Sequence, residues 1–153
     1  MLLQLDFWQF FPRLRRFQRG RQLLVYDPVR RKKVVLTPEE GVRQVVLLYL
    51  LEKKKYPPSH IRVEGEVTLN GMLRRCDIAV FDPRPEPWLL IECKSPKVGL
   101  TQAVFEQVAR YNLALCAPYL AITDGEHTFC ARLYPERQAF EFLSDFPDYP
   151  SGS

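Results

Sequence analysis

The sequence has little of what a zinc site or a disulfide-stapled scaffold requires. It contains 4 cysteines and 2 histidines in 153 residues, with no CxxC pair and no Cys/His cluster. A structural zinc ion is therefore not expected, and the simplest interpretation is buried, reduced thiols.

Long apolar runs and targeting signals are also missing. The apolar N-terminal stretch is interrupted by Asp6 and by the basic run at 13–16, well short of a membrane span, and no small-residue cleavage site follows a positive segment. We expect a cytoplasmic protein with no membrane partner. The glycines form neither GxxxxGK[ST] nor GxGxxG, so no nucleotide cofactor is expected.

What the chain does have is an uneven distribution of charge. Its 22 Lys+Arg and 18 Asp+Glu give a net charge of only +4. Residues 13–33 hold nine basic side chains and one acid, a charge of +8, which leaves −4 for the remainder. This indicates a polyanionic partner. The expected phosphate-binding residues are Arg15, Arg16, Arg30, Arg31, Lys32 and Lys33.

The strongest helix signal starts at Thr37, followed by Pro38 at the first helical position and Glu40 three residues after the cap. Apolar residues continue to 51, and three lysines then suit the negative end of the helix dipole. A second helix is predicted over about 100–115.

Period-two patterns predict strands at 61–69 and 73–81, joined by the favoured hairpin turn Asn70-Gly71. Residues 88–93 are apolar at almost every position, as expected of a central strand, and further strands are predicted at 119–123 and 128–133. The order α-β-β-β-α-β-β predicts an α/β fold with a mixed sheet flanked by helices.

The ends of the chain are predicted to be less regular. Residues 1–20 favour a short amphipathic helix broken near Pro12, with strand pieces at 22–26 and 33–36. The aromatic residues of this segment are expected in the core or in a dimer interface. The predicted organisation is a basic, aromatic arm at 1–24, a domain at 25–145, and a flexible, frayed tail at 146–153.

Charged residues in two apolar strands are the candidates for chemistry. Asp77 lies in one strand, and Glu92 and Lys94 share one face at the end of the next. Because buried charges are costly unless paired or bound to a metal, two interpretations are open. One is a Mg²⁺ site of two carboxylates and a backbone carbonyl; the other is an Asp77–Lys94 salt bridge with Glu92 at a strand end.

The order of these residues resembles the PD-(D/E)xK nuclease superfamily, and within it the N-terminal nuclease domain of type I restriction enzyme R subunits. Cys76 stands where the superfamily has the proline of its name. The resemblance implies a restriction-endonuclease-like core and rests on Glu40, Asp77, the strand end Glu92-Cys93-Lys94, and the QxxxY pair Gln107 and Tyr111.

The same resemblance implies roles for these residues. Asp77, Glu92 and the carbonyl of Cys93 are metal ligands, and Lys94 acts on the attacking water. Gln107 and Tyr111 lie on one helical face, either for catalysis or as part of an ordinary amphipathic helix. Glu40 is either near the metal or only a helix cap, with Glu39 as the alternative if the register is off by one.

The expected function is a Mg²⁺-dependent DNA nuclease, with Mn²⁺ as a substitute metal. The alternative is a non-catalytic module that binds nucleic acid or protein on the same fold. Expected partners are DNA and either a second copy of the chain or a separate targeting or motor protein, because the sequence has no Walker motif and no helix-turn-helix.

Overall fold

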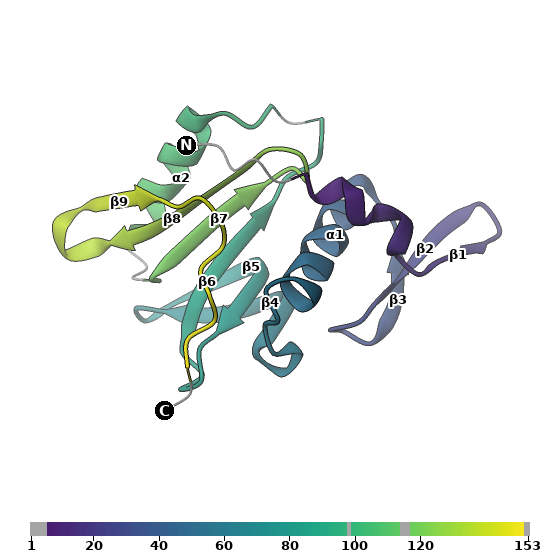
Figure 1. Cartoon of the computed structure of the whole chain (residues 1–153), viewed down its shortest axis with the longest axis horizontal. Helices are drawn as coiled ribbons and strands as arrows, with labels where there is room; N and C mark the ends of the chain where they lie inside the picture. Colours follow the sequence, from purple (N-terminus) through teal and green to yellow (C-terminus); the bar gives the residue numbers. More distant parts are fainter. Residues whose placement is uncertain (1–5, 98, 114–116, 152–153) are drawn as a thin grey trace.

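A six-stranded mixed sheet forms the centre of the molecule in the computed structural model, which describes residues 6–97, 99–113 and 117–151 (Figure 1). The strand order follows the sequence, and β6 and β7 form a parallel pair while the other neighbours are antiparallel. The strands are β4 (Ile61–Leu69), β5 (Met72–Phe81), β6 (Pro87–Cys93), β7 (Tyr119–Thr123), β8 (Thr128–Tyr134) and β9 (Ala139–Phe142).

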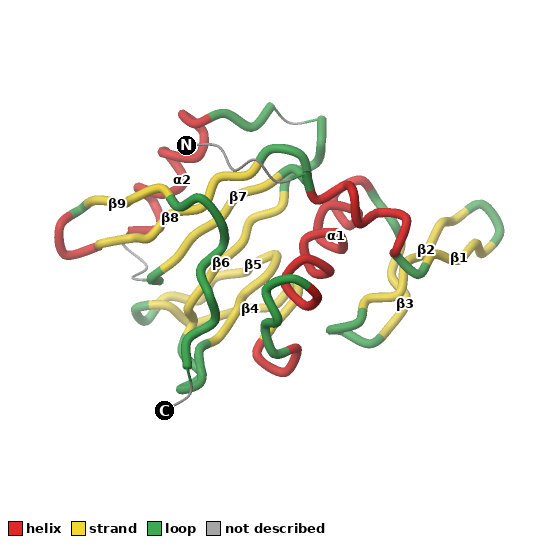
Figure 2. The backbone as a smooth tube through the Cα atoms, viewed as in Figure 1, coloured by secondary structure: helices red, strands yellow, loops and turns green. Residues whose placement is uncertain are grey.

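Two helices cover opposite faces of this sheet (Figure 2). Helix α1 (Pro38–Glu52) buries Val42 and Leu47 against Ile78 and Leu89, and α2 (Gln102–Leu113) buries Phe105 in the cluster on the other face. This confirms the predicted α/β fold with a mixed sheet between helices. Neither of the described helices is long and apolar enough to cross a membrane.

The local signals for the first helix and the hairpin are confirmed. Thr37 Oγ1 accepts a hydrogen bond from the Glu40 backbone N–H at 3.1 Å, as an N-cap does. Asn70 and Gly71 both have positive φ, 50° and 77°, which a two-residue type I′ turn requires. Strand β9 was not predicted; it follows a short 3-10 helix, Pro135–Arg137, and a left-handed residue at Gln138.

A second, three-stranded antiparallel sheet projects from the body (Figure 1). It contains β1 (Arg16–Arg19), β2 (Gln22–Asp27) and β3 (Lys32–Val35), close to the two predicted strand pieces. The short helix predicted within 1–20 is present in its described part as a 3-10 helix, η1 (Phe7–Arg13), and it ends just after Pro12, where the break was expected; β1 then replaces the rest of the predicted helix. Proline lacks an N–H, so Pro12 cannot donate within a helix.

The described parts of both chain ends pack on the α1 face, so the tail that was expected to be frayed is anchored at its start. Phe7 and Phe10 are buried in the same cluster as α1. Phe146 is 2% exposed and stacks on Phe7, with ring centroids 5.8 Å apart. The expected interior position is thus confirmed for these N-terminal aromatics; residues 1–5 and 152–153 lie outside the described residues.

The hairpin of β4 and β5 has one irregular position in each strand. The ladder pairs Val63 with Ile78 and Gly65 with Cys76, but Glu64 and Asp77 between them are not paired. Glu64 has φ of 51°, outside the strand region. Val63 and Ile78, on the side of Glu64 and Asp77 away from the turn, pack in the cluster of α1. Cys76 and Val67, on the side toward the turn, pack in the cluster of α2.

Candidate active site

Asp77 and Glu92 meet where β5 and β6 separate. The ladder between these strands reaches Ile78 and Ile91, and the two acids occupy the next position on each strand. Asp77 Oδ2 accepts a hydrogen bond from the Cys93 backbone N–H at 2.9 Å. Both acids line a cavity of about 160 Å³. Their side chains are 22% and 26% exposed, so they are open to solvent but firmly held.

Lys94 follows β6 directly and is held by the parallel strand beside it. Its backbone N–H donates to the Thr123 carbonyl at 2.8 Å, and its Nζ lies 3.7 Å from Glu92 Oε2. The structure therefore places Glu92 next to Asp77 on the neighbouring strand and Lys94 next to Glu92. The ion pair that forms is Glu92–Lys94, whereas Asp77 pairs with an arginine and not with Lys94.

Each carboxylate has its own guanidinium partner, and sequence reasoning identified neither. Asp77 Oδ1 accepts from Arg43 Nη2 at 3.1 Å, and Glu92 Oε1 accepts from Arg74 Nη2 at 3.0 Å. Arg74 also donates to the side chain of Asn112 on α2. A signal for Arg43 was available, because an arginine inside the apolar run of a buried helix needs an acidic partner.

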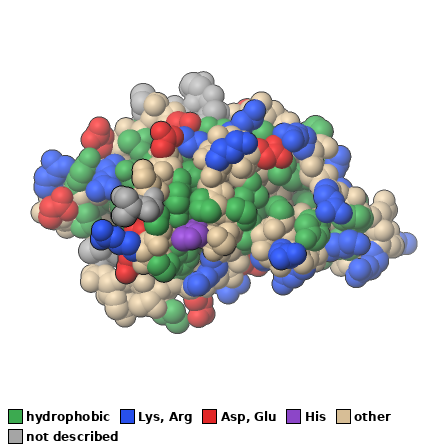
Figure 3. Space-filling view, turned by 60° about the horizontal axis from the view of Figure 1, so that its bottom comes forward, with side chains coloured by type: hydrophobic (Ala, Val, Ile, Leu, Met, Phe, Trp, Pro, Cys, Tyr) green, Lys and Arg blue, Asp and Glu red, His purple; other side chains and the backbone are tan. Residues whose placement is uncertain are grey.

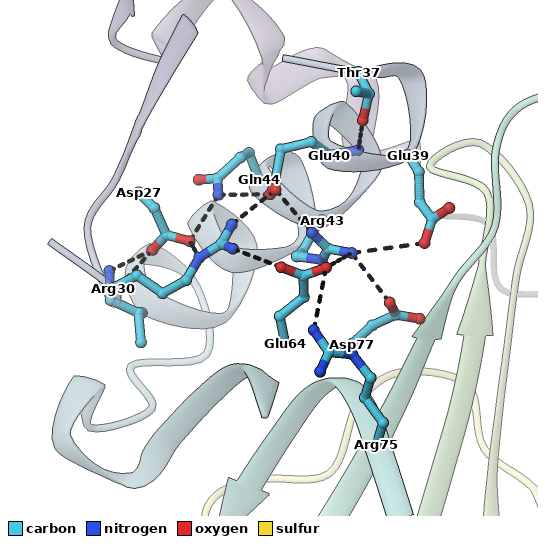
Figure 4. A network of polar contacts seen from close by, with 11 residues as sticks. Asp27, Arg30, Thr37, Glu39, Glu40, Arg43, Gln44, Glu64, Arg75 and Asp77 are labelled. Atoms are coloured by element: carbon cyan, nitrogen blue, oxygen red, sulfur yellow. Dashed lines mark hydrogen bonds and ion pairs between the residues drawn. The ribbon is translucent and has the colours of Figure 1, made fainter. Parts of the chain in front are cut away.

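Glu40 is bound to basic and amide side chains (Figure 4). Its Oε1 accepts from Arg30 and Arg43, each at 2.8 Å, and its Oε2 accepts from Gln44 at 3.1 Å. The Thr37 half of a capping box is present, but the carboxylate is directed to these three donors. Glu40 is therefore more than a simple helix cap, and the alternative that it lies near a metal stays a prediction.

The QxxxY residues lie on α2, which covers the opposite face of the sheet from α1. Tyr111 is 63% exposed, and the Arg74 guanidinium lies over its ring, 5.4 Å from the centroid. Gln107 is exposed on the same helix. Tyr111 is therefore joined to Glu92 through Arg74, which links this part of α2 to the carboxylates.

The expected phosphate-binding residues divide into two kinds. Lys and Arg side chains gather over the projecting sheet, at the right of Figure 3. Five of the six expected residues have exposed side chains: Arg15, Arg16, Arg31, Lys32 and Lys33. Arg30 differs, because its side chain is only 14% exposed and forms ion pairs with Asp27 at 2.6 Å, Glu40 at 2.8 Å and Glu64 at 3.1 Å. Its charge is already neutralised within the protein.

Electrostatics of the buried groups follow from these contacts. Burial raises the pKa of Asp27, but hydrogen bonds from Arg30, Gln44 and the Val29 backbone outweigh burial and hold the pKa below its ordinary value. Burial raises the pKa of the Cys76 thiol to about 11 and that of Cys93 well above its ordinary range. Both thiols are therefore protonated at neutral pH.

The donors at this site suit a hard cation. Within the described ranges, no group of three acidic, histidine or cysteine side chains is placed to hold one metal ion. Asp77, Glu92 and the backbone carbonyl of Cys93 offer only oxygen, and Mg²⁺ characteristically binds through one or two carboxylates while keeping several waters. The residues present therefore fit a magnesium ion that water helps to coordinate.

A mixed sheet with helices on both faces is consistent with a restriction-endonuclease-like α/β fold. Residues 38–147 match the family described as the type I restriction enzyme R protein N terminus (HSDR_N), and the chain belongs to this family. The match includes Asp77, Glu92 and Lys94 but none of β1 to β3. No curated protein matches the chain.

Proposed function

We propose that this protein is a magnesium-dependent nuclease that hydrolyses DNA phosphodiester bonds. The observation that carries the proposal is that Asp77 and Glu92 lie side by side where the pairing of β5 with β6 stops, with Lys94 Nζ 3.7 Å from Glu92. The family membership supports a nuclease role. DNA as substrate is supported by the exposed basic groups on the projecting sheet.

Asp77, Glu92 and the Cys93 carbonyl would hold the metal, with Mn²⁺ able to replace Mg²⁺. When bound, the ion would supply positive charge for a developing phosphoryl oxygen and lower the pKa of a coordinated water. The Cys93 N–H fixes one Asp77 oxygen, so this ligand is oriented before the metal arrives. Lys94, 37% exposed beside Glu92, orients the attacking water and stabilises the charge on the phosphate.

Other residues have supporting roles in the proposal. Arg15, Arg16, Arg31, Lys32 and Lys33 bind the DNA backbone without reading its sequence. Gln107 and Tyr111 contact the substrate from α2, with Arg74 beside Tyr111. A separate targeting or motor protein or a second copy of this chain directs the domain to DNA, in keeping with the type I R subunit family to which the chain belongs.

The test is cleavage of plasmid DNA with Mg²⁺ or Mn²⁺ by the wild type, Asp77→Asn and Lys94→Ala. Lys97→Ala is the matched control for the lysine, since Lys97 is exposed three residues further along. Glu66→Gln, an exposed acid on β4, controls for loss of one carboxylate. We expect metal-dependent cleavage that both site variants abolish and both controls retain.

One observation favours the non-catalytic alternative: both carboxylates are already paired with arginines. A binding module would retain DNA or partner binding without cleavage in any metal. Cleavage that is independent of metal, or full activity in Asp77→Asn, would contradict the proposed nuclease mechanism.

A further inference from the structure

The Arg43 guanidinium is surrounded by carboxylates from three elements (Figure 4). Its Nη2 lies 3.1 Å from Asp77 Oδ1 on β5. The same nitrogen lies 3.6 Å from Glu39 Oε1 on α1 and 3.8 Å from Glu64 Oε1 on β4. Three acidic oxygens around one nitrogen favour a positive charge, and here the guanidinium supplies it; with Arg43 in place, these side chains are not arranged to hold a metal ion.

Arg43 is held in this place from the opposite side. Its Nη1 donates to Glu40 at 2.8 Å, and Glu40 is held in turn by Arg30 and Gln44. The side chain is 5% exposed, and its Nε is buried with no hydrogen-bond partner among the described residues. An arginine buried this deeply cannot leave its acidic partners without a large energetic cost.

The position of this guanidinium next to the proposed metal site has a consequence for metal stoichiometry. In two-metal nucleases the ions lie about 3.5–4 Å apart. One carboxylate can be shared between two such ions. Asp77 is placed for this, because one of its oxygens accepts from Arg43 while the other accepts from the Cys93 backbone N–H. Arg43 Nη2, 3.1 Å from Asp77 Oδ1, already holds the position beside this oxygen that a second cation would take.

We propose that Arg43 permanently occupies the place of a second divalent cation, so that this site binds one metal ion per chain. The inference rests on the proposed function for the first ion. Glu39 and Glu64 are 49% and 41% exposed, so they can move inward if the guanidinium is removed. A divalent ion would then draw oxygens to about 2.1 Å, closer than they approach the arginine nitrogen.

Calorimetric titration of Mn²⁺ tests this inference without requiring a substrate. We expect one ion for the wild type, two for Arg43→Gln, and one for Arg43→Lys, which retains a positive charge. Arg75→Gln is the matched control, because Arg75 also lies near the Glu64 carboxylate, at 3.7 Å. Arg75 is 64% exposed and does not fill the buried position that Arg43 fills, so its variant should bind one ion. Circular dichroism of each variant checks that it is folded.

Two ions in the wild type, or one in a folded Arg43→Gln, would overturn the inference and leave the proposed nuclease intact. No ion in the wild type would overturn the proposed function itself. If Arg43→Gln does not fold, Glu64→Gln decides: the exposed Glu64 is not a ligand in the wild type, so its variant should bind one ion with unchanged affinity. A loss of Mn²⁺ binding in Glu64→Gln would refute the role given to Arg43.

Discussion

Arg30 and Lys32 are basic neighbours that should respond to substitution in opposite ways. Arg30 pairs with Asp27, whose side chain is 0% exposed. Arg30→Gln leaves that carboxylate without its cationic partner, and breaking a buried pair costs about 3–5 kcal/mol. For a chain of this size 1 kcal/mol corresponds to about 2–4 °C, so the melting temperature should fall by roughly 10 °C.

Lys32→Gln should leave stability within about 0.5 kcal/mol of the wild type, because Lys32 is exposed. Thermal unfolding followed by circular dichroism measures both variants under identical conditions. Equal losses in the two variants, or a loss below about 1 kcal/mol for Arg30→Gln, would refute the assignment of Arg30 to the buried network.

For DNA binding, Lys32→Gln should have the larger effect and Arg30→Gln the smaller one, the reverse of their effects on stability. Each phosphate contact contributes about 0.9 to the slope of log K against log salt concentration. Fluorescence anisotropy with labelled duplex should therefore give a slope smaller by about 0.9 for Lys32→Gln, and an unchanged slope for Arg30→Gln measured well below its melting temperature. A reduced slope for Arg30→Gln alone would contradict this division of the basic residues.

Three further outcomes follow from buried groups. Phe146→Ala should lower the free energy of unfolding by about 3–5 kcal/mol, measured by urea denaturation; a loss below about 1 kcal/mol would mean that the C-terminal segment is not anchored. Because the folded pKa of Asp27 lies below its ordinary 3.8, its stabilising contribution is present above that pH and is lost as pH falls through the folded value. Asp27→Asn should therefore flatten the acid limb of stability against pH, and an unchanged limb would count against it. Cys76, with a pKa of about 11, should be alkylated by iodoacetamide at pH 8 far more slowly in the folded than in the unfolded protein, as peptide mass spectrometry can follow; equal rates would show that the thiol is accessible.

Local patterns predicted most of the central fold. The cap at Thr37, the turn at Asn70-Gly71 and the strand periods each depend on residues close in sequence, and the structure has those elements near the expected bounds. Strand β9 is only four residues long and gave no comparable signal. Phe146 was misjudged because its proline-rich surroundings indicate irregular chain, and irregular chain can still bury an aromatic ring.

The site was predictable in its acids and lysine but not in their partners. Asp77 and Glu92 stood out as charges in apolar strands. The contacts of Arg43 and Arg74 with them span 34 and 18 residues in sequence, and no local pattern specifies such pairs. The left-handed backbone at Glu64 was equally hidden, because glutamate is not one of the residues enriched in that conformation.

The unpaired positions Glu64 and Asp77 constrain how the length of this hairpin can vary. Each strand has one residue at this point that interrupts the alternation of side chains between the two faces. Because both strands have one such residue, the pairs before and after it belong to the same register. Deleting one residue from either strand alone would shift every pair between this point and the turn. Deleting one from both would restore a regular hairpin but remove the aspartate. Insertions and deletions in this hairpin should therefore occur at the Asn70-Gly71 turn and not near Asp77.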